Sequence, residues 1–303
     1  MKKILIVSTI LLTIMSFSKA QQMPLYSQYM MNGFLLNPAM AGNVDYIPLR
    51  LTVRQQWVGI TDAPSTQAIS GHYLFNNKKM GLGGYIYNDM FGPIRQTGIQ
   101  ACYSYHLQMG TNNKLALGIA FKAFQFEYDE TALTVIDEND PVVQNAKEST
   151  FIPDADLGIY FYDDEHRYFA GFAATQLIEL DIKLDESNKN SMVRHYYLTG
   201  GYKFKISEEF DLEPSILVKG TEKTPFQLDF NAKGYYKKNY WLGVSYRSSK
   251  DIVAIIGIKV DKYYIGYSFD YPFSNINNYS SGSHEIMIGF NIGEGANTGS
   301  SLL

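Results

Sequence analysis

From residue 47 onward, hydrophobic and polar side chains alternate with a period of two along most of the chain. In the clearest run, 226–236, the even positions are apolar, aromatic or glycine, whereas the odd positions include Gln227, Asp229, Asn231 and Lys233. Successive side chains of a β-strand point to opposite faces, so this pattern predicts a strand with one apolar and one polar face. A period of 3.6 residues is almost absent, and the sequence therefore predicts an all-β protein.

About fourteen such runs can be read from the sequence, and most are near the roughly nine to eleven residues with which a tilted strand crosses a bilayer. The predicted strands are 47–57, 66–75, 80–89, 95–107, 114–127, 154–162, 168–176, 194–206, 210–220, 226–237, 240–248, 251–260, 262–271 and 283–292.

The connections between these strands alternate in length. Long or medium connections are expected at 58–65, 90–94, 128–153, 177–193, 221–225 and 272–282, and tight ones at 76–79, 108–113, 163–167, 207–209, 238–239 and 261. Only 249–250 is short where the alternation requires a long connection. Outer-membrane barrels have short periplasmic turns and longer extracellular loops. The sequence therefore predicts a closed antiparallel transmembrane β-barrel of about 14 strands, with both barrel termini in the periplasm and the long loops extracellular.

A soluble β-sandwich or propeller is the alternative fold, because it also has short strands at regular spacing. The composition favours the barrel: aromatic residues make up 15% of the chain, yet the mean hydropathy is only −0.17. A barrel has this composition because its strands alternate lipid-facing with lumen-facing residues, and its aromatic residues gather at the two membrane interfaces. On this basis Trp57 and Trp241, at strand ends, are expected to anchor the barrel at the interfaces.

The first twenty residues have the pattern of a signal peptide (1–20). Lys2 and Lys3 precede an apolar run at 4–14, and Ser18-Lys19-Ala20 forms a cleavage site. A membrane anchor is the alternative, but about eleven apolar residues fall short of the roughly twenty that a span needs. The opposite end of the chain, 293–303, is rich in Gly and Ser and is expected to form a flexible tail.

Residues 21–46, between the signal and the first strand, are predicted to form a plug segment inside the barrel lumen. The segment is Met-rich and its only charge is Asp45, so it needs cover from water. It cannot form a membrane helix, because it is interrupted by Pro24, Gly33, Pro38 and Gly42. Asn37 is expected to cap a short turn or helix, and Gly42 to allow the chain reversal into the first strand. The side chains expected to pack against the barrel interior are Tyr26, Tyr29, Met30 and Phe34.

The residue types do not point to catalysis or a cofactor. The mature chain would carry 23 basic against 30 acidic residues, which disfavours nucleic acid as a partner. Cys102 is the only cysteine, so no intramolecular disulfide is expected. The five histidines are scattered without metal-ligand spacing, although His195 or His284 could join a triad built from distant strands. The acidic residues of loop 129–153 leave calcium binding open.

The lumen-facing charges and the glycines inside strands carry structural expectations. Arg50, Arg54, Asp229 and Lys233 should pair across the barrel interior, because a buried charge needs a partner or water. The glycines of 81–85 lie inside a strand and should make room for neighbouring bulk or mark a bend.

The plug segment also carries a family resemblance. It contains P-L-Y-S-Q-Y-M at 24–30, N-P-A at 37–39 and A-G at 41–42, followed by R-Q-Q-W at 54–57. This combination resembles the PorP/SprF family of Bacteroidota outer-membrane proteins associated with type IX secretion. The resemblance implies a barrel that supports export or surface attachment of a large secreted protein, typically an adhesin of gliding motility or attachment.

Two functions remain open at this stage. The first is a non-enzymatic secretion accessory, whose partners would be an adhesin, bound through its C-terminal region, and periplasmic or peptidoglycan-linked secretion components. The second is an outer-membrane channel for a small apolar ligand, similar to a fatty-acid transporter. The residues expected to form the lumenal plug and motif, with structural or partner contacts, are Tyr26, Ser27, Gln28, Tyr29, Asn37, Pro38, Ala39, Gly42, Gln56 and Trp57.

Overall fold

The computed structural model describes residues 26–132, 147–182 and 190–293. The predicted signal peptide and nearly all of the predicted tail lie outside these ranges. The strands are β1 (Ile47–Gln55), β2 (Ser65–Leu74), β3 (Met80–Phe91), β4 (Ile94–Met109), β5 (Asn113–Asp129), β6 (Lys147–Asp163), β7 (Tyr168–Thr175), β8 (Asp181–Ile182), β9 (Asn190–Ser191), β10 (His195–Tyr202), β11 (Phe204–Lys205), β12 (Phe210–Thr221), β13 (Gln227–Tyr236), β14 (Tyr240–Arg247), β15 (Asp251–Val260), β16 (Tyr263–Pro272) and β17 (Ser283–Ile292).

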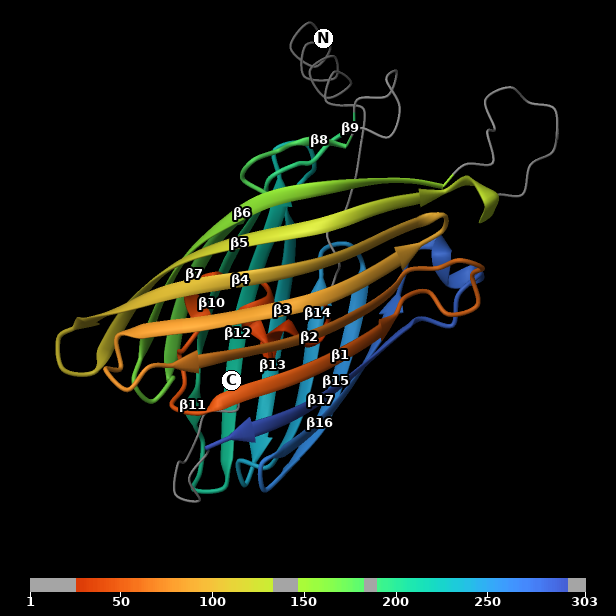
Figure 1. Ribbon diagram of the computed structural model, residues 1–303. Coiled ribbons are helices and arrows are strands. Elements are labelled where there is room, and N and C mark those ends of the chain that lie inside the picture. Colours follow the sequence, from red (N-terminus) through yellow and green to blue (C-terminus); the bar gives the residue numbers. More distant parts are fainter. Residues whose placement is uncertain (1–25, 133–146, 183–189, 294–303) are drawn as a thin grey trace, which may run out of the picture.

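The strands form one closed antiparallel barrel (Figure 1). Each barrel strand pairs with the next barrel strand along the chain, with β7 pairing β10, and β1 pairs with β17 from Ile47↔Ile292 to Gln55↔His284. β11 continues β10 along β12 after a break at Lys203, so the two together make one barrel strand. The barrel therefore has 14 strands, which confirms the predicted fold class, and β8 and β9 form a separate small hairpin. None of the helices among the described residues is long and apolar enough to cross a membrane.

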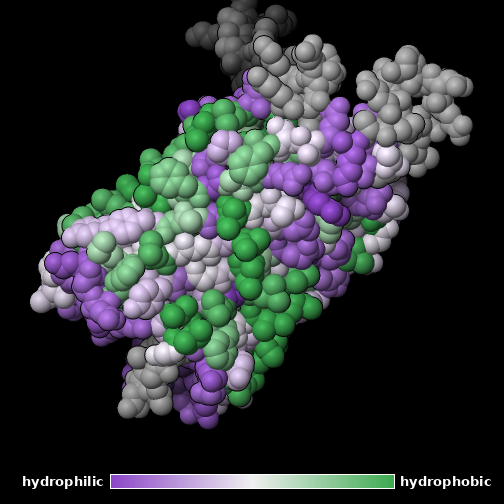
Figure 2. Space-filling model, viewed as in Figure 1, coloured by the Kyte–Doolittle hydropathy of each residue, from purple (hydrophilic) through white to green (hydrophobic). Residues whose placement is uncertain are grey.

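The two faces of the sheet are reversed relative to a soluble protein. In β13, Leu228 and Phe230 are exposed, whereas Asp229, Asn231 and Lys233 are buried. The same alternation recurs around the barrel, and hydrophobic side chains gather over the strands while hydrophilic ones concentrate toward the two ends (Figure 2). An apolar belt of this extent needs an apolar solvent, so the alternation predicted from the sequence describes a membrane barrel and excludes the sandwich and the propeller.

The barrel has two different ends. One, the tight-turn end, is formed by the connections 75–79, 110–112, 164–167, 206–209, 237–239 and 261–262. β1 begins and β17 ends there, so both barrel termini share this end. The other, the long-loop end, carries the remaining connections, including the 3₁₀ turns η4 (Glu130–Ala132) after β5 and η5 (Asn275–Asn278) before β17.

Three details differ from the sequence prediction. β5 and β6 have 17 residues each and remain paired as far as Asp129↔Lys147, so residues 128–129 and 147–153 of the predicted loop 128–153 are strand. The predicted connection 90–94 is reduced to Gly92-Pro93, because β3 and β4 pair as far as Phe91↔Ile94. Part of the predicted loop 177–193 forms the β8–β9 hairpin.

Trp241 was expected at the membrane interface, and this expectation is wrong. Its side chain is only 2% exposed and lies in the lumen beside Tyr264, with the ring centroids 5.9 Å apart. The reason is strand parity: Trp241 shares the buried face of β14 with Ser245 and Arg247. Gly257 on β15 leaves room for the indole, since a Cβ there would lie 2.1 Å from it.

Candidate functional site

The plug segment lies inside the lumen over its described part, residues 26–46. It folds as three short 3₁₀ helices, η1 (Gln28–Met30), η2 (Gly33–Leu35) and η3 (Pro38–Met40). Tyr29, Met30 and Phe34 are buried in two clusters shared with lumen-facing barrel side chains, and Tyr26 packs against one of them. These four contacts confirm the packing predicted from the sequence.

Ser27 anchors the start of the described segment in a cluster of buried charges. Its hydroxyl donates to Asp270 Oδ2 at 2.6 Å and accepts hydrogen bonds from Arg54 Nη1 at 2.7 Å and Arg247 Nη2 at 2.9 Å. Both arginines also pair with Asp270, at 2.7 and 2.9 Å. The four side chains come from the plug, β1, β14 and β16, so the cluster ties the plug to distant parts of the wall.

Glu285 on β17 completes this cluster by binding the plug backbone. Its two carboxylate oxygens accept the N–H groups of Ser27 at 2.6 Å and Gln28 at 2.9 Å. The Gln28 side chain donates to the Glu285 carbonyl at 3.1 Å and lies where a Cβ on Gly266 would be. Charge-assisted bonds of this kind are among the stronger ones in proteins, so the Ser27-Gln28 pair is held firmly.

Further along, the plug contacts β12 and β13. Tyr29 donates its hydroxyl hydrogen to Asn231 Oδ1 at 3.0 Å, and the Met30 carbonyl accepts from Lys233 Nζ at 2.7 Å. Lys233 also pairs with Glu213 at 2.8 Å. The predicted pairing of lumen-facing charges is therefore confirmed for Arg54, Lys233 and Asp229, the last of which pairs with Arg247 at 3.5 Å, and the plug takes part in it. Arg50 instead donates to Asn291 Oδ1 at 2.8 Å.

Asn37, Pro38 and Ala39 form the tightest contact between plug and wall. The Asn37 side chain accepts the Ala39 N–H at 2.9 Å, which confirms the predicted cap, and its amide donates to the Ile159 carbonyl at 3.0 Å. Ala39 is fully buried. A Cβ on Gly118 would lie 2.3 Å from Ala39 N, and one on Gly158 would lie 2.0 Å from Asn37 Oδ1. The plug thus sits where β5 and β6 have no side chain.

Gly42 turns the plug toward β1. Its φ is +73°, a left-handed conformation that favours glycine, and its N–H donates to His72 Nδ1 at 3.1 Å. Just before it, the Ala41 carbonyl accepts from Ser104 Oγ at 2.5 Å and lies 2.8 Å from His106 Nε2. A Cβ on Gly81 would lie 2.2 Å from the Ala41 oxygen, so this glycine does make room for neighbouring bulk, as predicted.

Gln56 and Trp57 do not join the plug. Both are half-buried in the β1–β2 connection at the long-loop end. The Gln56 N–H donates to the Pro64 carbonyl and the Trp57 N–H to Ser283 Oγ, at 2.8 and 3.1 Å. The structure therefore brings together eight of the ten predicted residues, while these two brace a loop. A functional role for any of the ten remains a prediction.

Replacing Asn37 by alanine should destabilise the folded barrel by about 1–3 kcal/mol, because both the cap and the bond to Ile159 are lost from a buried site. Asn37→Ser separates the two contributions, since it keeps a cap acceptor for Ala39 and removes the amide that donates to the Ile159 carbonyl, without adding a buried charge. Melting temperatures of the purified variants measure both effects. An Asn37→Ala protein as stable as the parent would contradict the proposed cap.

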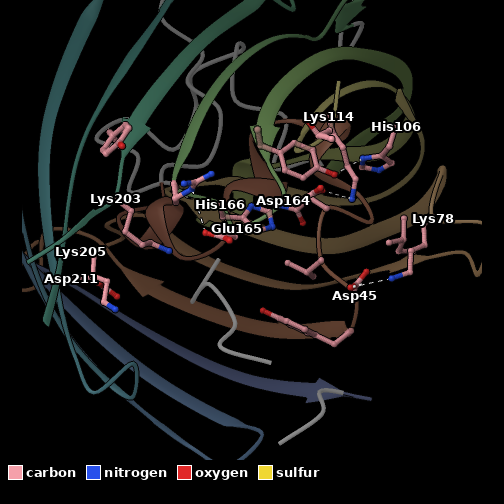
Figure 3. A pocket seen from close by; sticks show the side chains of 18 of the residues that line it. Asp45, Lys78, His106, Lys114, Asp164, Glu165, His166, Lys203, Lys205 and Asp211 are labelled. Atoms are coloured by element: carbon pink, nitrogen blue, oxygen red, sulfur yellow. Dashed lines mark hydrogen bonds and ion pairs between the residues drawn. The ribbon is translucent and has the colours of Figure 1, made fainter. Parts of the chain in front are cut away.

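A large vestibule opens at the tight-turn end, with residues 43–46 of the plug among its lining. Its volume is about 1480 Å³, and its wall is built from β2, β4–β6 and β10–β13 with their turns. Figure 3 shows ionisable side chains from several elements facing this space, among them Asp45, His106, Lys114, His166 and Lys203.

His166, in the β6–β7 turn, is buried beneath the vestibule surface. Its ring stacks on Tyr162 at 5.1 Å between centroids, and burial, followed by the charge of Lys203, lowers its pKa to about 4. Its proton therefore binds more tightly in the unfolded chain, where the pKa is about 6.5. The stabilising contribution of neutral His166 is complete above pH 6.5 and is lost as the pH falls toward 4, a loss of up to about 3 kcal/mol.

The variant His166→Phe keeps the stacked ring and removes the titration. Between pH 7.5 and 4.5 its melting temperature should therefore fall less than that of the parent. If the melting temperatures of the two proteins fell by the same amount over this pH range, His166 would not titrate within it, and the prediction would be wrong.

The sequence did not single out Arg247, Asp270, Glu285 or Ser104, nor the vestibule. The available signal was parity: each of these four residues lies on the buried face of its strand. Parity identifies a lumen-facing residue, but it does not show which plug residue lies at the same height.

The closed barrel with its apolar outer belt and buried plug defines a plugged outer-membrane β-barrel protein. No curated protein matches the chain in sequence. The sequence matches the family described as type IX secretion system membrane protein PorP/SprF over residues 18–290. The protein thus belongs to the PorP/SprF family of type IX secretion outer-membrane proteins, as the plug motifs predicted.

Similar solved structures are also outer-membrane barrels. The toluene transporter TbuX of Ralstonia pickettii has a TM-score of 0.51 at 8% identity, with 86% of this chain and 92% of the transporter covered. A Pseudomonas aeruginosa FadL homologue has a TM-score of 0.47 at 12% identity, with 84% and 91% covered. At these identities the first likeness supports the fold alone.

Proposed function

We propose that this barrel is a non-enzymatic accessory of type IX secretion that supports export or surface attachment of a large secreted adhesin. The observation that carries the proposal is the plug: the family motif residues Ser27, Gln28 and Asn37 are bound to the wall through buried hydrogen bonds. A lumen closed by such a segment suits a docking platform better than a free passage. The barrel then contributes surfaces at its two ends, and the chemistry of transport belongs to other components.

In this proposal the tight-turn end faces the periplasm and the long-loop end faces outward. The support is the difference in connection length, which in outer-membrane barrels runs from short periplasmic turns to longer outer loops. The adhesin would then bind through its C-terminal region at the long-loop end. Periplasmic or peptidoglycan-linked secretion components would meet the tight-turn end.

Deleting the gene and measuring the adhesin at the cell surface tests the proposal. We expect the adhesin to be lost from the surface and restored by the complete chain. A matched control is a second secreted protein that uses another attachment route, whose surface level should not change. Unchanged adhesin export and attachment would refute the proposed role.

The second candidate, a channel for a small apolar ligand, is suggested by the similarity of the fold to that of a toluene transporter. Against it, an apolar cavity between the plug and strands β6, β7, β10, β12 and β13, lined by Met30 and Tyr160 among others, measures only about 40 Å³. This is far below the roughly 300–1,000 Å³ of ligand pockets. Toluene binding by the purified barrel, or its uptake into vesicles containing it, would favour this candidate.

A further inference from the structure

The vestibule differs in charge from the rest of the molecule. The complete chain has a formal net charge of −4, yet the vestibule is lined by seven cationic and five anionic side chains. Four of the five lining carboxylates, all except Asp211, are paired with lining cations: Asp164 with Lys114 and Glu208 with Lys205, each at 2.8 Å, Glu165 with Arg167 at 3.4 Å, and Asp45 with Lys78 at 3.5 Å. The vestibule therefore presents an excess of positive charge within a negatively charged protein.

Two lysines carry this excess. Lys79 in the β2–β3 turn and Lys238 in the β13–β14 turn are exposed, and neither forms an ion pair with the described residues. The two lysines come from different parts of the wall, so their charges are spread along the opening of the vestibule and do not form a single compact anion site. Such an arrangement attracts an extended acidic ligand and raises its local concentration.

The wall of the vestibule also contains a strand edge. β7 begins at Tyr168, opposite Tyr202, whereas the neighbouring strand continues as β11 to Lys205. The N–H of Ile206 is bonded to the Phe210 carbonyl on the β12 side. Because backbone groups alternate in direction along a strand, Lys205 directs its N–H and C=O away from β12, beyond the end of β7. An incoming strand can pair with such groups.

We propose that the vestibule binds an extended, acidic polypeptide segment of a partner protein, which pairs with the free edge of β11 and faces Lys79 and Lys238. The volume of about 1480 Å³ exceeds the roughly 300–1,000 Å³ of small-molecule pockets, which favours a polymer. The open strand edge favours a polypeptide over other anionic polymers. The inference rests on the proposed function in one respect: it assigns this end to a periplasmic secretion component.

The probes are two fluorescein-labelled ten-residue peptides, one alternating Glu with Thr and the other Lys with Thr. Fluorescence anisotropy measures their binding to the full chain in neutral detergent. We expect the Glu peptide to bind about tenfold or more tightly than the Lys peptide. The double variant Lys79→Glu/Lys238→Glu should weaken the Glu peptide about tenfold, whereas Lys223→Glu/Lys250→Glu, at the long-loop end, should leave binding unchanged.

Lys205→Pro tests the strand edge, because it removes the outward N–H while the bonds to β12 remain. Lys205→Gln is its control, since it also removes the charge and the ion pair with Glu208 but keeps the outward N–H. Weaker binding by Lys205→Pro than by Lys205→Gln is the expected result, and equal binding by the two would refute edge pairing.

Equal binding of the two peptides, or equal effects of the double variants at the two ends, would overturn the proposal. The proposal would also be overturned if the Lys79→Glu/Lys238→Glu variant no longer bound anionic phospholipid vesicles but still bound the Glu peptide. In that case the vestibule would be a site for lipid headgroups. The cell-surface assay separates this site from the general function. If a variant loses peptide binding but exports the adhesin normally, the vestibule site does not contribute to secretion. If the parent protein itself does not bind the Glu peptide, the vestibule site is refuted and the proposed secretion role is unaffected.

Discussion

Replacing Gly118 by alanine is expected to displace the plug from its seat. The added Cβ would lie 2.3 Å from Ala39 N and 2.5 Å from the Pro38 carbonyl carbon, so backbone and not a flexible side chain must move. Overpacking of well-packed interiors usually costs about 1–3 kcal/mol, and a clash with backbone belongs at the upper end of this range. The melting temperature should therefore fall by several degrees.

A displaced plug has a second consequence that can be measured. The lumen would open, so Gly118→Ala should conduct ions in a planar bilayer more often than the parent. The matched control is Gly200→Ala, also in a strand, where the nearest atom to the new Cβ is the Phe169 oxygen at an ordinary 3.7 Å. If the two variants have the same stability and conductance, Ala39 and Gly118 do not form the seat of the plug.

These expectations depend on contacts between the plug and the barrel wall. The sequence shows which residues face the lumen, but it does not show which of them touch. The period of two in runs such as 226–236 was sufficient to predict the strands, because lipid on one face and a packed lumen on the other impose different chemistry on alternate residues. The same alternation led to the pairing of lumen-facing charges, and it was overlooked only for Trp241, whose parity places it inside.

The extension of β5 and β6 could not be predicted in this way. In the segment 147–153, residues 147–150 are polar, with charges at Lys147 and Glu148, and Pro153 by itself favours a loop, so Phe151 and Ile152 are the only apolar residues typical of a strand. The segment becomes strand because β5 offers a continuous partner as far as Asp129. Pro153 is tolerated because β6 pairs with β7 only from Leu157 onward, so no ladder bond on that side is lost.

The plug was predicted from its composition, whereas its attachment was not. Ser27 and Asp270 are 243 positions apart in sequence, and only barrel closure through β1 and β17 brings Arg54 beside Glu285. The sequence assigns each residue to a face. The height at which residues from distant strands meet depends on the register of all the strands between them.

Replacing Asp270 by asparagine is expected to destabilise the barrel by about 3–5 kcal/mol. Asp270 is the shared partner of Arg54 and Arg247 and accepts the hydroxyl hydrogen of Ser27. After its neutralisation the two arginines retain only their longer ion pairs, Arg54 with Glu285 and Arg247 with Asp229, each at 3.5 Å, so the buried cluster carries an excess positive charge. Removing one partner of a buried ion pair is costly because the remaining charge stays desolvated. Thermal unfolding of the purified protein measures the effect.

Two further variants test whether this loss of stability comes from the buried charge cluster. Arg247→Met combined with Asp270→Asn should cost less than the sum of the single changes, because the double variant restores charge balance around Ser27, with a coupling of about 0.5–3 kcal/mol. Glu208→Gln removes an exposed carboxylate from the tight-turn end, where its partner Lys205 is 63% exposed, and should leave the melting temperature nearly unchanged. If Asp270→Asn were as harmless as Glu208→Gln, the buried cluster could not be what fixes the plug at its Ser27 end.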